Sequence, residues 1–317
     1  MSHKIILAVH HGALGDLILA YPTLFALNTH SYHVHLLCRD QLGQLTCRHG
    51  FSEKSYSLES PLFVSLYSDS VDPAIENLLN AYNGVLLFSY SEALYRTIRE
   101  KTRLPVFRIP PRPDADQPIH VAEHLLSGLY STGLINKPKT TVEKILEDWG
   151  KPVKQSSSKR VWIHPGAGSR DKMWPVANFI NAASLLRSLN MEPAFFLGPA
   201  ELFLFNHLAK HASGIPVYRS MDILELTDLL ETGVAFLGND SGITHLAAFL
   251  GLSTVAVFGP SDPTRWRPLG RAVCVVQGRL QCHPCFEARE RGCKTSECFS
   301  GISPEAVIRA LSGLLRY

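Results

Sequence analysis

Residues 233–259 read GVAFLGNDSGITHLAAFLGLSTVAVFG, which is two apolar runs separated by a glycine-bearing turn and a helical stretch. The first run, 233–237, suits a buried strand, and the turn 238–242 contains two glycines and small polar residues. Asp240 or Ser241 can cap the helix that follows. A helix that opens directly after a strand presents N–H groups and the positive end of its dipole. The stretch therefore predicts an anion-binding site above a parallel sheet.

The composition of the chain bounds its class. Of 317 residues, 45% are hydrophobic and 19% are charged, and the net charge is +3. The length favours two domains, and the small net charge argues against bulk nucleic-acid binding. We find no signal-peptide pattern and no apolar run long enough to cross a bilayer, so we expect a cytoplasmic protein. In that compartment the seven cysteines are expected to be reduced or metal-bound.

The two halves of the chain begin in the same way. Residues 4–10 form an apolar run, followed by the glycine loop 11–16 and an apolar helical stretch. Residues 160–164 form a second such run, followed by the glycine loop 165–171, which also ends in an acid. The first loop lacks the glycine spacing of the dinucleotide fingerprint and the Lys-Ser/Thr pair of a phosphate-binding P-loop. Strand, glycine loop and helix in this order are typical of doubly wound α/β domains.

Pro152 and three consecutive serines make residues 151–159 the best linker. On both sides of it strands alternate with helices, with 62–66 as one further strand, which indicates parallel sheets. We predict two Rossmann-like, doubly wound domains facing each other across a cleft, over residues 1–150 and 151–317. The helix expected over 304–314 is placed in the second domain, with packing back on the first domain as an alternative.

Four side chains with chemical potential stand in loops expected at the carboxyl ends of strands. Asp16 suits a helix cap or a general base that accepts a proton from an acceptor hydroxyl. Lys172 suits a surface cation or a point charge on a phosphate. Glu201 suits a partner of a helix dipole or a ligand of the paired hydroxyls of a ribose. His245 suits a core residue or a donor to phosphate. The residues alone leave all four pairs of alternatives open.

Basic residues are concentrated between positions 96 and 112. They are Arg96, Arg99, Lys101, Arg103, Arg108 and Arg112. One interpretation is a solvated face with an exposed loop, and the other is a patch for an anionic acceptor or a membrane surface.

Four cysteines near the C-terminus have a spacing that suggests a metal site. They are Cys282, Cys285, Cys293 and Cys298, and only the first two form a C-x-x-C pair. A structural zinc site and reduced cysteines packing a loop are both compatible with this pattern. A catalytic metal is not, because four thiolates leave no open coordination position.

Several motifs together resemble glycosyltransferase family 9, the ADP-heptose:lipopolysaccharide heptosyltransferases. They are HGALGD at 11–16, HPGAG at 164–168 with KMWP at 172–175, GPAE at 198–201 and NDSGITH at 239–245. The resemblance covers the first 25 residues and nearly all of the second half. The Asn-Asp-Ser-Gly-x-x-His motif is its most specific part.

The resemblance implies the GT-B architecture, with an acceptor-binding first domain and a nucleotide-sugar-binding second domain. It also implies an inverting transfer without a cofactor or catalytic metal. The donor would be a nucleoside-diphosphate sugar, with heptose from ADP-heptose as the expected case. The acceptor would be an anionic glycan or glycolipid such as the lipopolysaccharide core. Peripheral contact with the inner face of the inner membrane would follow, and nucleic acid is not an expected partner.

The resemblance also assigns roles to individual residues. Asp16 matches the general base, Lys172 the phosphate-binding lysine, Glu201 the ribose-binding acid and Met221 the residue against adenine. The loop for the diphosphate and sugar is matched by Asp240, Ser241, Gly242 and His245. Gly15 and Ser169, in the two glycine loops, complete the substrate-binding candidates.

Two other classes of protein remain alternatives. Two Rossmann-like halves also suit an NAD-dependent oxidoreductase, although the dinucleotide fingerprint and its ribose-binding acid are absent from the sequence. A non-catalytic nucleotide-sugar-binding module could keep the same fold, but Asp16 and Lys172 together argue for an enzyme. Stabilisation by NAD and not by ADP would favour the oxidoreductase.

Overall fold

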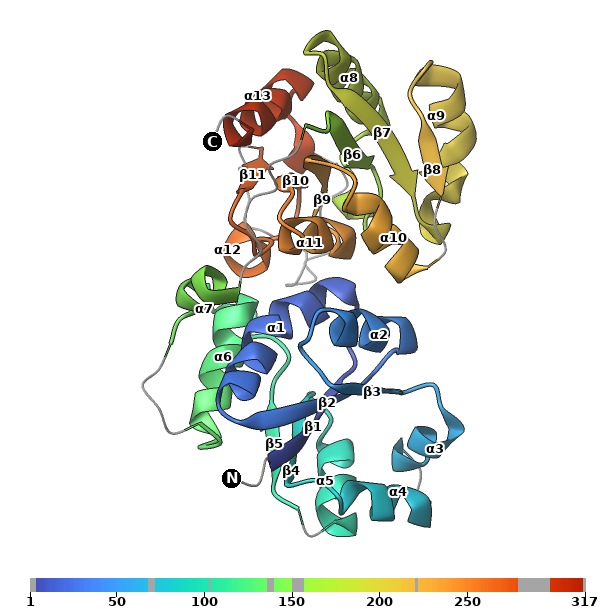
Figure 1. The fold of residues 1–317 in the computed structure, drawn as a ribbon. Helices are drawn as coiled ribbons and strands as arrows, with labels where there is room; N and C mark the ends of the chain where they lie inside the picture. The colour runs from blue at the N-terminus through green and yellow to red at the C-terminus, as the bar shows by residue number, and fades with distance from the viewer. Residues whose placement is uncertain are drawn as a thin grey trace. The chain divides into compact units, whose positions relative to one another are not determined.

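The structure is a computed structural model that describes residues 4–67, 72–102, 104–135, 140–149, 157–219, 222–278 and 297–315. The chain divides into two compact units (Figure 1). Unit 1 consists of Met1–Asp114 and Val121–Glu147. Unit 2 consists of Ala115–His120 and Asp148–Tyr317. The short segment Ala115–His120 therefore belongs to unit 2 although its neighbours in sequence on both sides belong to unit 1.

Unit 1 is built on a five-stranded parallel sheet with the order β3-β2-β1-β4-β5. Its strands are β1 (Lys4–His10), β2 (Tyr32–Cys38), β3 (Lys54–Ser57), β4 (Gly84–Phe88) and β5 (Val106–Ile109). Its helices are α1 (Leu14–Thr29), α2 (Asp40–Arg48), α3 (Pro61–Val64), α4 (Pro73–Leu79), α5 (Glu92–Lys101) and α6 (Val121–Ser131). Helix α7 (Val142–Trp149) runs across the boundary between the units.

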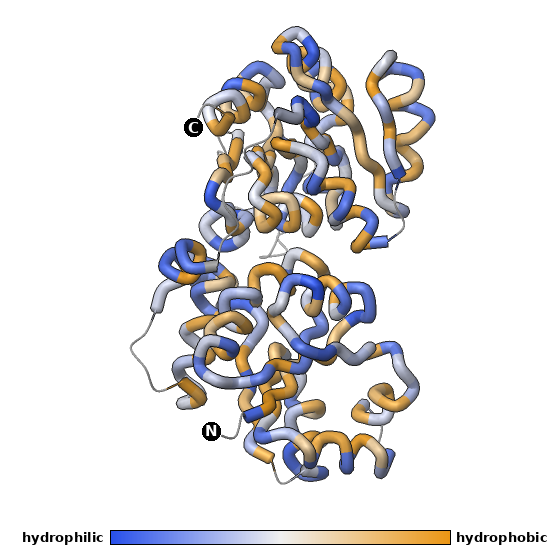
Figure 2. The backbone as a smooth tube through the Cα atoms, viewed as in Figure 1, coloured by the Kyte–Doolittle hydropathy of each residue, from blue (hydrophilic) through white to orange (hydrophobic). Residues whose placement is uncertain are grey.

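Both faces of the first sheet are covered. Leu7 and Val9 of β1 share a buried cluster with Leu79 of α4 and Ile98 of α5. Helices α1 and α6 pack on each other and lie on the opposite side of the sheet (Figure 1). The central strands β1 and β4 are hydrophobic along most of their length (Figure 2). Strands buried on both faces need such continuous apolar runs, which explains why these two were predictable.

Unit 2 repeats the arrangement on a six-stranded parallel sheet with the order β11-β10-β9-β6-β7-β8. Its strands are β6 (Arg160–His164), β7 (Glu192–Leu197), β8 (Val217–Arg219), β9 (Ala235–Asn239), β10 (Ser253–Phe258) and β11 (Val273–Gln277). Its helices are α8 (Val176–Ser188), α9 (Phe205–His211), α10 (Ile223–Leu230), α11 (Gly242–Phe249), α12 (Pro263–Trp266) and α13 (Pro304–Leu314). In chain order this is the Rossmann sequence 3-2-1-4-5-6.

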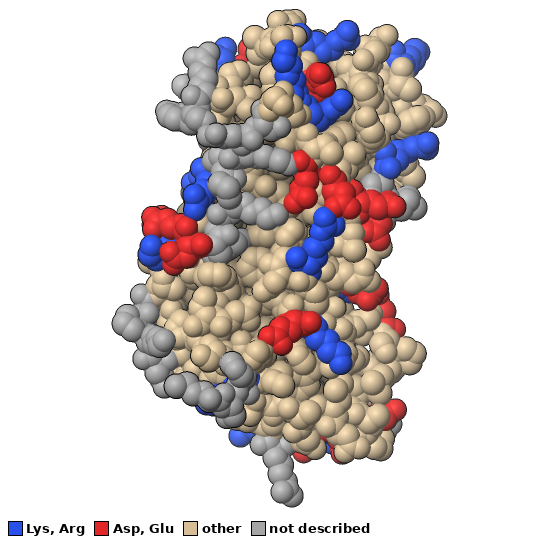
Figure 3. All heavy atoms as spheres, in the orientation of Figure 1, with Lys and Arg blue, Asp and Glu red and all other residues tan. Residues whose placement is uncertain are grey.

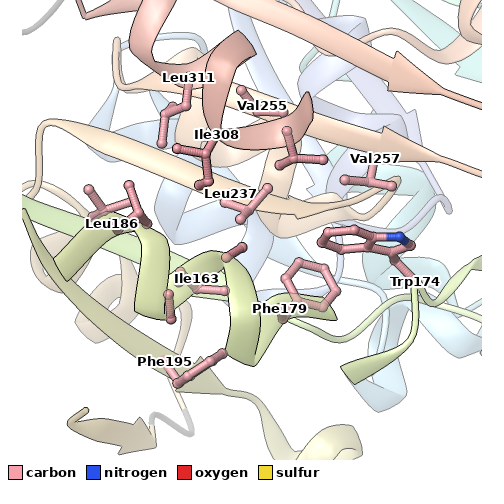
Figure 4. Close-up of a cluster of buried hydrophobic side chains, with 14 of the residues drawn as sticks. Ile163, Trp174, Phe179, Leu186, Phe195, Leu237, Val255, Val257, Ile308 and Leu311 are labelled. Carbon is pink, nitrogen blue, oxygen red and sulfur yellow. The ribbon is translucent and has the colours of Figure 1, made fainter. Parts of the chain in front are cut away.

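One hydrophobic core of unit 2 lies between its sheet and the helices α8 and α13. Trp174 and Phe179 pack edge to face with ring centroids 5.0 Å apart, next to Ile163 and Leu237 of the central strands (Figure 4). Ile308 of α13 belongs to the same cluster. Helix α13 contacts α8 and β10, so its apolar side is buried within unit 2.

The predicted fold class is confirmed: the chain forms two parallel α/β units of Rossmann topology. One predicted element was wrong. Residues 62–66 are not a strand, because α3 occupies Pro61–Val64 and a 3₁₀ turn follows at Ser65–Tyr67. Pro61 stands at the start of α3, where its fixed φ favours a helical turn. The third strand of unit 1 is instead the polar segment Lys54–Ser57.

Candidate functional site

The predicted anion site lies at the carboxyl ends of β9 and β6, which are neighbours in the second sheet. The chain order of the strands reverses between these two strands, and open α/β sheets bind their ligands at such a switch point. Asn239, the last residue of β9, is fully buried. Its Nδ2 donates to the carbonyls of Pro165 at 2.8 Å and Gly166 at 3.1 Å, and its Oδ1 accepts from the Trp174 N–H at 2.9 Å. One side chain thus joins the start of the second glycine loop to Trp174, which lies just beyond the end of that loop.

Helix α11 begins at this point with a side-chain cap. Ser241 is the N-cap residue, and its Oγ accepts from the Thr244 N–H at 3.3 Å. The Thr244 hydroxyl donates to the Asn239 carbonyl at 2.5 Å, which ties the helix start back to the strand. Gly242 opens the helix, and its first N–H groups have no acceptor one turn earlier in the helix. The predicted arrangement of strand, tight turn and helix is confirmed here.

Lys172 and Asp240 form a close ion pair at the start of α11. The distance from Lys172 Nζ to Asp240 Oδ2 is 2.7 Å, and the two side chains are 16% and 6% exposed. Lys172 ends a 3₁₀ turn over Arg170–Lys172, whose N-cap is Ser169. The Ser169 Oγ accepts from the Asp171 N–H at 3.4 Å, so it shapes the turn that carries the lysine. Lys172 and Asp240 belong to separate sequence motifs, and the structure brings them together.

Glu201 lies beside His164 in the same part of unit 2. Glu201 belongs to a 3₁₀ helix over Pro199–Leu204 that follows β7, and it is only 7% exposed. The Nε2 atom of His164, the last residue of β6, is 3.5 Å from Glu201 Oε2. His164 was not a candidate in the sequence analysis. Its position as the last residue of a central strand, at the binding edge of the sheet, was the signal that could have identified it.

Of the predicted site residues His245 and Met221, the structure describes only His245. His245 lies in the first turn of α11 and is 3% exposed, so the structure places it next to the anion site but inside the packed part of the unit. Its backbone N–H donates to the Ser241 carbonyl at 3.2 Å. Met221, the predicted adenine contact, lies outside the described residues.

Asp16 occupies the equivalent place in unit 1. It is the third residue of α1, and its Oδ2 accepts from the Ala13 N–H at 3.0 Å. This bond closes the start of the helix, so the capping role holds whether or not Asp16 has a chemical one. Gly12 is required here, because a Cβ at this position would lie 2.5 Å from Asp16 Cβ and 2.7 Å from His10 Cε1. Gly15 lies in the first turn of the same helix.

His10 is the last residue of β1 and His11 follows it, and neither was a candidate for chemistry in the sequence analysis. His10 is 2% exposed, and its pKa is lowered to about 3. Burial is the main cause, and electrostatic repulsion by the neighbouring His11 is the second. Its ring meets Phe88 of β4 edge to face at 5.8 Å. Burial also lowers the pKa of His11, whose Nε2 contacts the Tyr67 hydroxyl. The first glycine loop therefore starts from two imidazoles that favour the neutral form.

The basic stretch of α5 and β5 is partly neutralised. Two arginines form ion pairs with Glu92. Arg96 Nε lies 3.2 Å from Oε1, and Arg108 Nη1 lies 2.5 Å from Oε2. Arg108 also lies over the Tyr95 ring, 5.2 Å from its centroid. On the face drawn in Figure 3, basic and acidic side chains form small groups among uncharged residues. Within the described ranges, no helix is long and apolar enough to cross a membrane.

The predicted cysteine cluster is mostly outside the described ranges. Cys282, Cys285 and Cys293 belong to that part, whereas Cys298 is described and is half-buried. Among the residues that can be described, no group of three or more His, Cys, Asp or Glu side chains is arranged to hold a metal. The zinc hypothesis is therefore not supported by the described part of the chain.

With the site described, comparison with known proteins defines the class. A solved structure of a family 9 glycosyltransferase from Veillonella parvula superposes with a TM-score of 0.78 at 18% identity and covers 99% of this chain and 98% of its own. The Escherichia coli heptosyltransferase WaaC with ADP superposes with a TM-score of 0.72 at 16% identity, covering 98% of this chain and 100% of its own. The architecture is thus that of the GT-B glycosyltransferases.

The sequence comparisons define the family. The model of glycosyltransferase family 9 (heptosyltransferase) matches residues 126–295, so the chain belongs to this family and is a transferase enzyme. Lipooligosaccharide heptosyltransferase 2 of one Campylobacter jejuni strain is 22% identical over 95% of this chain and 96% of its own length. The homologue from another strain is 27% identical, but the match spans about half of each chain, 51% and 53%. The oxidoreductase and the non-catalytic module are no longer retained as alternatives.

Proposed function

We propose that this enzyme transfers a heptose from ADP-heptose to a lipopolysaccharide-core or related glycan. The observation that carries the proposal is the Lys172–Asp240 pair at the capped start of α11. A cation beside a helix N-terminus suits the diphosphate of a nucleotide sugar. The names of the relatives support the choice of sugar and acceptor, since they are lipooligosaccharide and lipopolysaccharide heptosyltransferases. Solved structures of E. coli WaaC contain ADP and ADP-2-deoxy-2-fluoro heptose.

We assign the donor site to unit 2. Lys172 and the N–H groups at the start of α11 would hold the diphosphate, and Asp240 would keep the ammonium group in place by its 2.7 Å bond. Ser169, Ser241, Gly242 and His245 would shape the loops around the diphosphate and the sugar. Glu201 would accept hydrogen bonds from the ribose hydroxyls, and Met221 would lie against the adenine. The residue roles rest on the family motifs, and the burial of Glu201 suits a fixed acceptor.

We assign the acceptor and the general base to unit 1. The acceptor hydroxyl would lose its proton to Asp16 while its oxygen attacks the anomeric carbon. The bond from that carbon to the phosphate oxygen would break on the opposite side, which inverts the configuration and releases ADP. Negative charge would grow on the leaving oxygen, where Lys172 and the dipole of α11 stabilise it. Gly15 would let the acceptor approach the start of α1.

The charge provided by Lys172 and α11 leads us to propose that no divalent metal takes part in the transfer. The experiment is a transfer assay in excess EDTA with ADP-heptose and a heptose-deficient core oligosaccharide, read by mass spectrometry. The expected result is undiminished transfer, and a strict requirement for added Mg²⁺ would contradict it. The zinc and iron content of the purified protein must be measured as well, because Cys282 and Cys285 form a C-x-x-C pair.

We further propose that the enzyme works at the inner face of the inner membrane by peripheral contact. The relatives act, by their names, on lipooligosaccharide and lipopolysaccharide, which are lipid-linked glycans. Arg96 and Arg99 of α5 are exposed and could meet an anionic surface. Flotation with anionic vesicles at low and physiological salt would measure the contact, and identical behaviour with neutral vesicles would contradict it.

A further inference from the structure

His164 is a buried imidazole that the proposed chemistry does not use. The residue is 2% exposed, and its ring packs on Phe196 with centroids 5.7 Å apart. Within the described part of the chain, neither ring nitrogen has a hydrogen-bond partner. A buried imidazole nitrogen without a partner is costly, so a residue in this state calls for a specific explanation.

The nearest charged group to this imidazole is the carboxylate of Glu201. The distance from His164 Nε2 to Glu201 Oε2 is 3.5 Å, and the two side chains are 2% and 9% exposed. The imidazole is therefore the deeper of the two groups, and the carboxylate is the one that reaches towards solvent. Lys172, the cation of the anion site, is bound to Asp240 instead.

Gly166 and Gly198 leave the space that the Glu201 side chain occupies. A Cβ at Gly166 would lie 2.2 Å from Glu201 Cγ and 2.6 Å from Oε1. A Cβ at Gly198 would lie 2.9 Å from Oε2. The carboxylate is thus fitted against backbone on two sides, with Oε1 towards Gly166 and Oε2 towards Gly198 and His164. Only a small shift separates the observed 3.5 Å from an ordinary hydrogen bond.

We propose that His164 is a positioning residue for Glu201: its Nε2–H donates to Oε2 and leaves Oε1 to accept from the ribose hydroxyls of the donor. The inference rests on the proposed function, because it takes Glu201 as the ribose ligand. His164 is well suited to the task, since it is the last residue of a central strand and its ring is fixed by Phe196. A rigid donor beneath a carboxylate selects one orientation of its two oxygens.

The test measures ADP and 2′-deoxy-ADP binding by titration calorimetry in the full-length enzyme. Wild-type protein should prefer ADP about tenfold, because one hydrogen bond to a charged group is lost with the deoxy compound. His164→Gln keeps an N–H donor of similar reach, and His164→Phe keeps a ring against Phe196 without the donor. We expect His164→Gln to retain most of the preference and His164→Phe to reduce it to about twofold. His207→Ala removes an exposed imidazole on α9 and should match wild type.

Several outcomes with the His164 variants would overturn the proposal. The first is an unchanged preference for ADP in both His164 variants. The second is a preference that His164→Phe retains and His164→Gln loses. The third is a loss of affinity in these variants that is equal for ADP and 2′-deoxy-ADP. Loss of the preference in both variants would also count against it. Glu201→Ala separates the two levels, because an unchanged preference there would refute the ribose role of Glu201 itself. If the variants fold poorly, ¹⁵N imidazole spectra of the wild-type protein with ADP remain decisive, since His164 must carry its proton on Nε2.

Discussion

The two glycine loops occupy the same place in the two units but are built differently. Each follows the first strand of its sheet, at the switch point between β1 and β4 in unit 1 and between β6 and β9 in unit 2. In unit 1 the loop runs directly into α1, and its acid, Asp16, binds the start of that helix. In unit 2 the loop ends in a 3₁₀ turn, and α11, which follows another strand, provides the helix start.

The two candidate sites differ in how many chain segments contribute to them. The capping bond of Asp16 spans three residues, so unit 1 builds its candidate base from one segment. In unit 2, Asn239 binds the loop after β6, Lys172 reaches Asp240 across 68 positions, and Glu201 comes from the segment after β7. One topology therefore supports a single acid in one unit and a converging set of charges in the other. Five changes test this contrast, in order of decreasing expected effect.

Asp16→Asn should have the largest effect. The amide oxygen can still accept from the Ala13 N–H, so the helix start is kept while the proposed base is lost. Turnover should fall by about 10²–10⁴-fold, with ADP affinity and the melting temperature close to wild type. Steady-state transfer assays and thermal unfolding provide the measurements. Activity near wild type would show that Asp16 is only a helix cap.

Lys172→Ala should have the second-largest effect on activity. Loss of the ammonium group removes the charge that we propose faces the leaving phosphate, and it leaves Asp240, which is 6% exposed, without its cation. We expect kcat/KM to fall by about 10²–10³-fold. The matched control is Lys210→Ala, an exposed lysine on α9 that should leave kcat/KM unchanged. Equal effects of the two substitutions would argue against a phosphate role for Lys172.

Asn239→Ala should mainly reduce stability. It leaves two backbone carbonyls and the Trp174 N–H without the side chain that joins them in a buried position. The expected loss is about 3 kcal/mol in the free energy of unfolding. Urea titrations of this variant and of Asn206→Ala, an exposed control on α9, provide the comparison. A loss under about 0.5 kcal/mol would mean that the loop holds its shape without this brace.

Gly166→Ala and Gly168→Ala form a matched pair within one loop. A methyl group at position 166 would meet Glu201 Cγ at 2.2 Å, whereas nothing lies within 4 Å of a methyl group at position 168. The first substitution should displace the Glu201 side chain and weaken ADP binding about tenfold, and the second should not. Calorimetric titration with ADP measures both. Similar affinities for the two variants would contradict the proposed place of Glu201 in the site.

The smallest effect is expected from the pH dependence of unit 1. Burial and the neighbouring His11 lower the pKa of His10 to about 3, from an ordinary value of 6.5. Between pH 6.5 and 3 the unfolded chain therefore binds a proton at His10 that the folded chain does not bind. The folded state is not penalised above pH 6.5, and its free energy of unfolding decreases as the pH falls towards 3. Between pH 6.5 and 5.5 the loss should be about 1 kcal/mol. In urea titrations at both values, His10→Gln should lose this contribution. The same pH dependence in wild type and variant would refute it.

The parts of the fold that the sequence predicts are those with local signals. Continuous apolar runs identify β1, β4, β6 and β9, because strands buried on both faces require them. Strand β3 is the short edge strand Lys54–Ser57, in which Tyr56 alone packs against the core, so no hydrophobic pattern marks it. The run 62–66 is apolar but begins after Pro61, and the structure resolves that ambiguity in favour of a helical turn.

The candidate site shows the same division. The glycine loops, the cap at Ser241 and the charged residues Lys172 and Asp240 follow from short motifs. The brace made by Asn239 and the pairing of His164 with Glu201 could not be predicted, since they depend on which strands are neighbours in the sheet. Strand order is a property of the whole unit, and no short window of sequence contains it.

The most direct test of the central claim is a crystal structure of the enzyme soaked with ADP-heptose in the presence of EDTA. We expect the diphosphate within hydrogen-bonding distance of Lys172 Nζ and of the N–H groups at the start of α11, with the ribose hydroxyls bound to Glu201. A nucleotide bound elsewhere in unit 2, or on the first glycine loop, would contradict it.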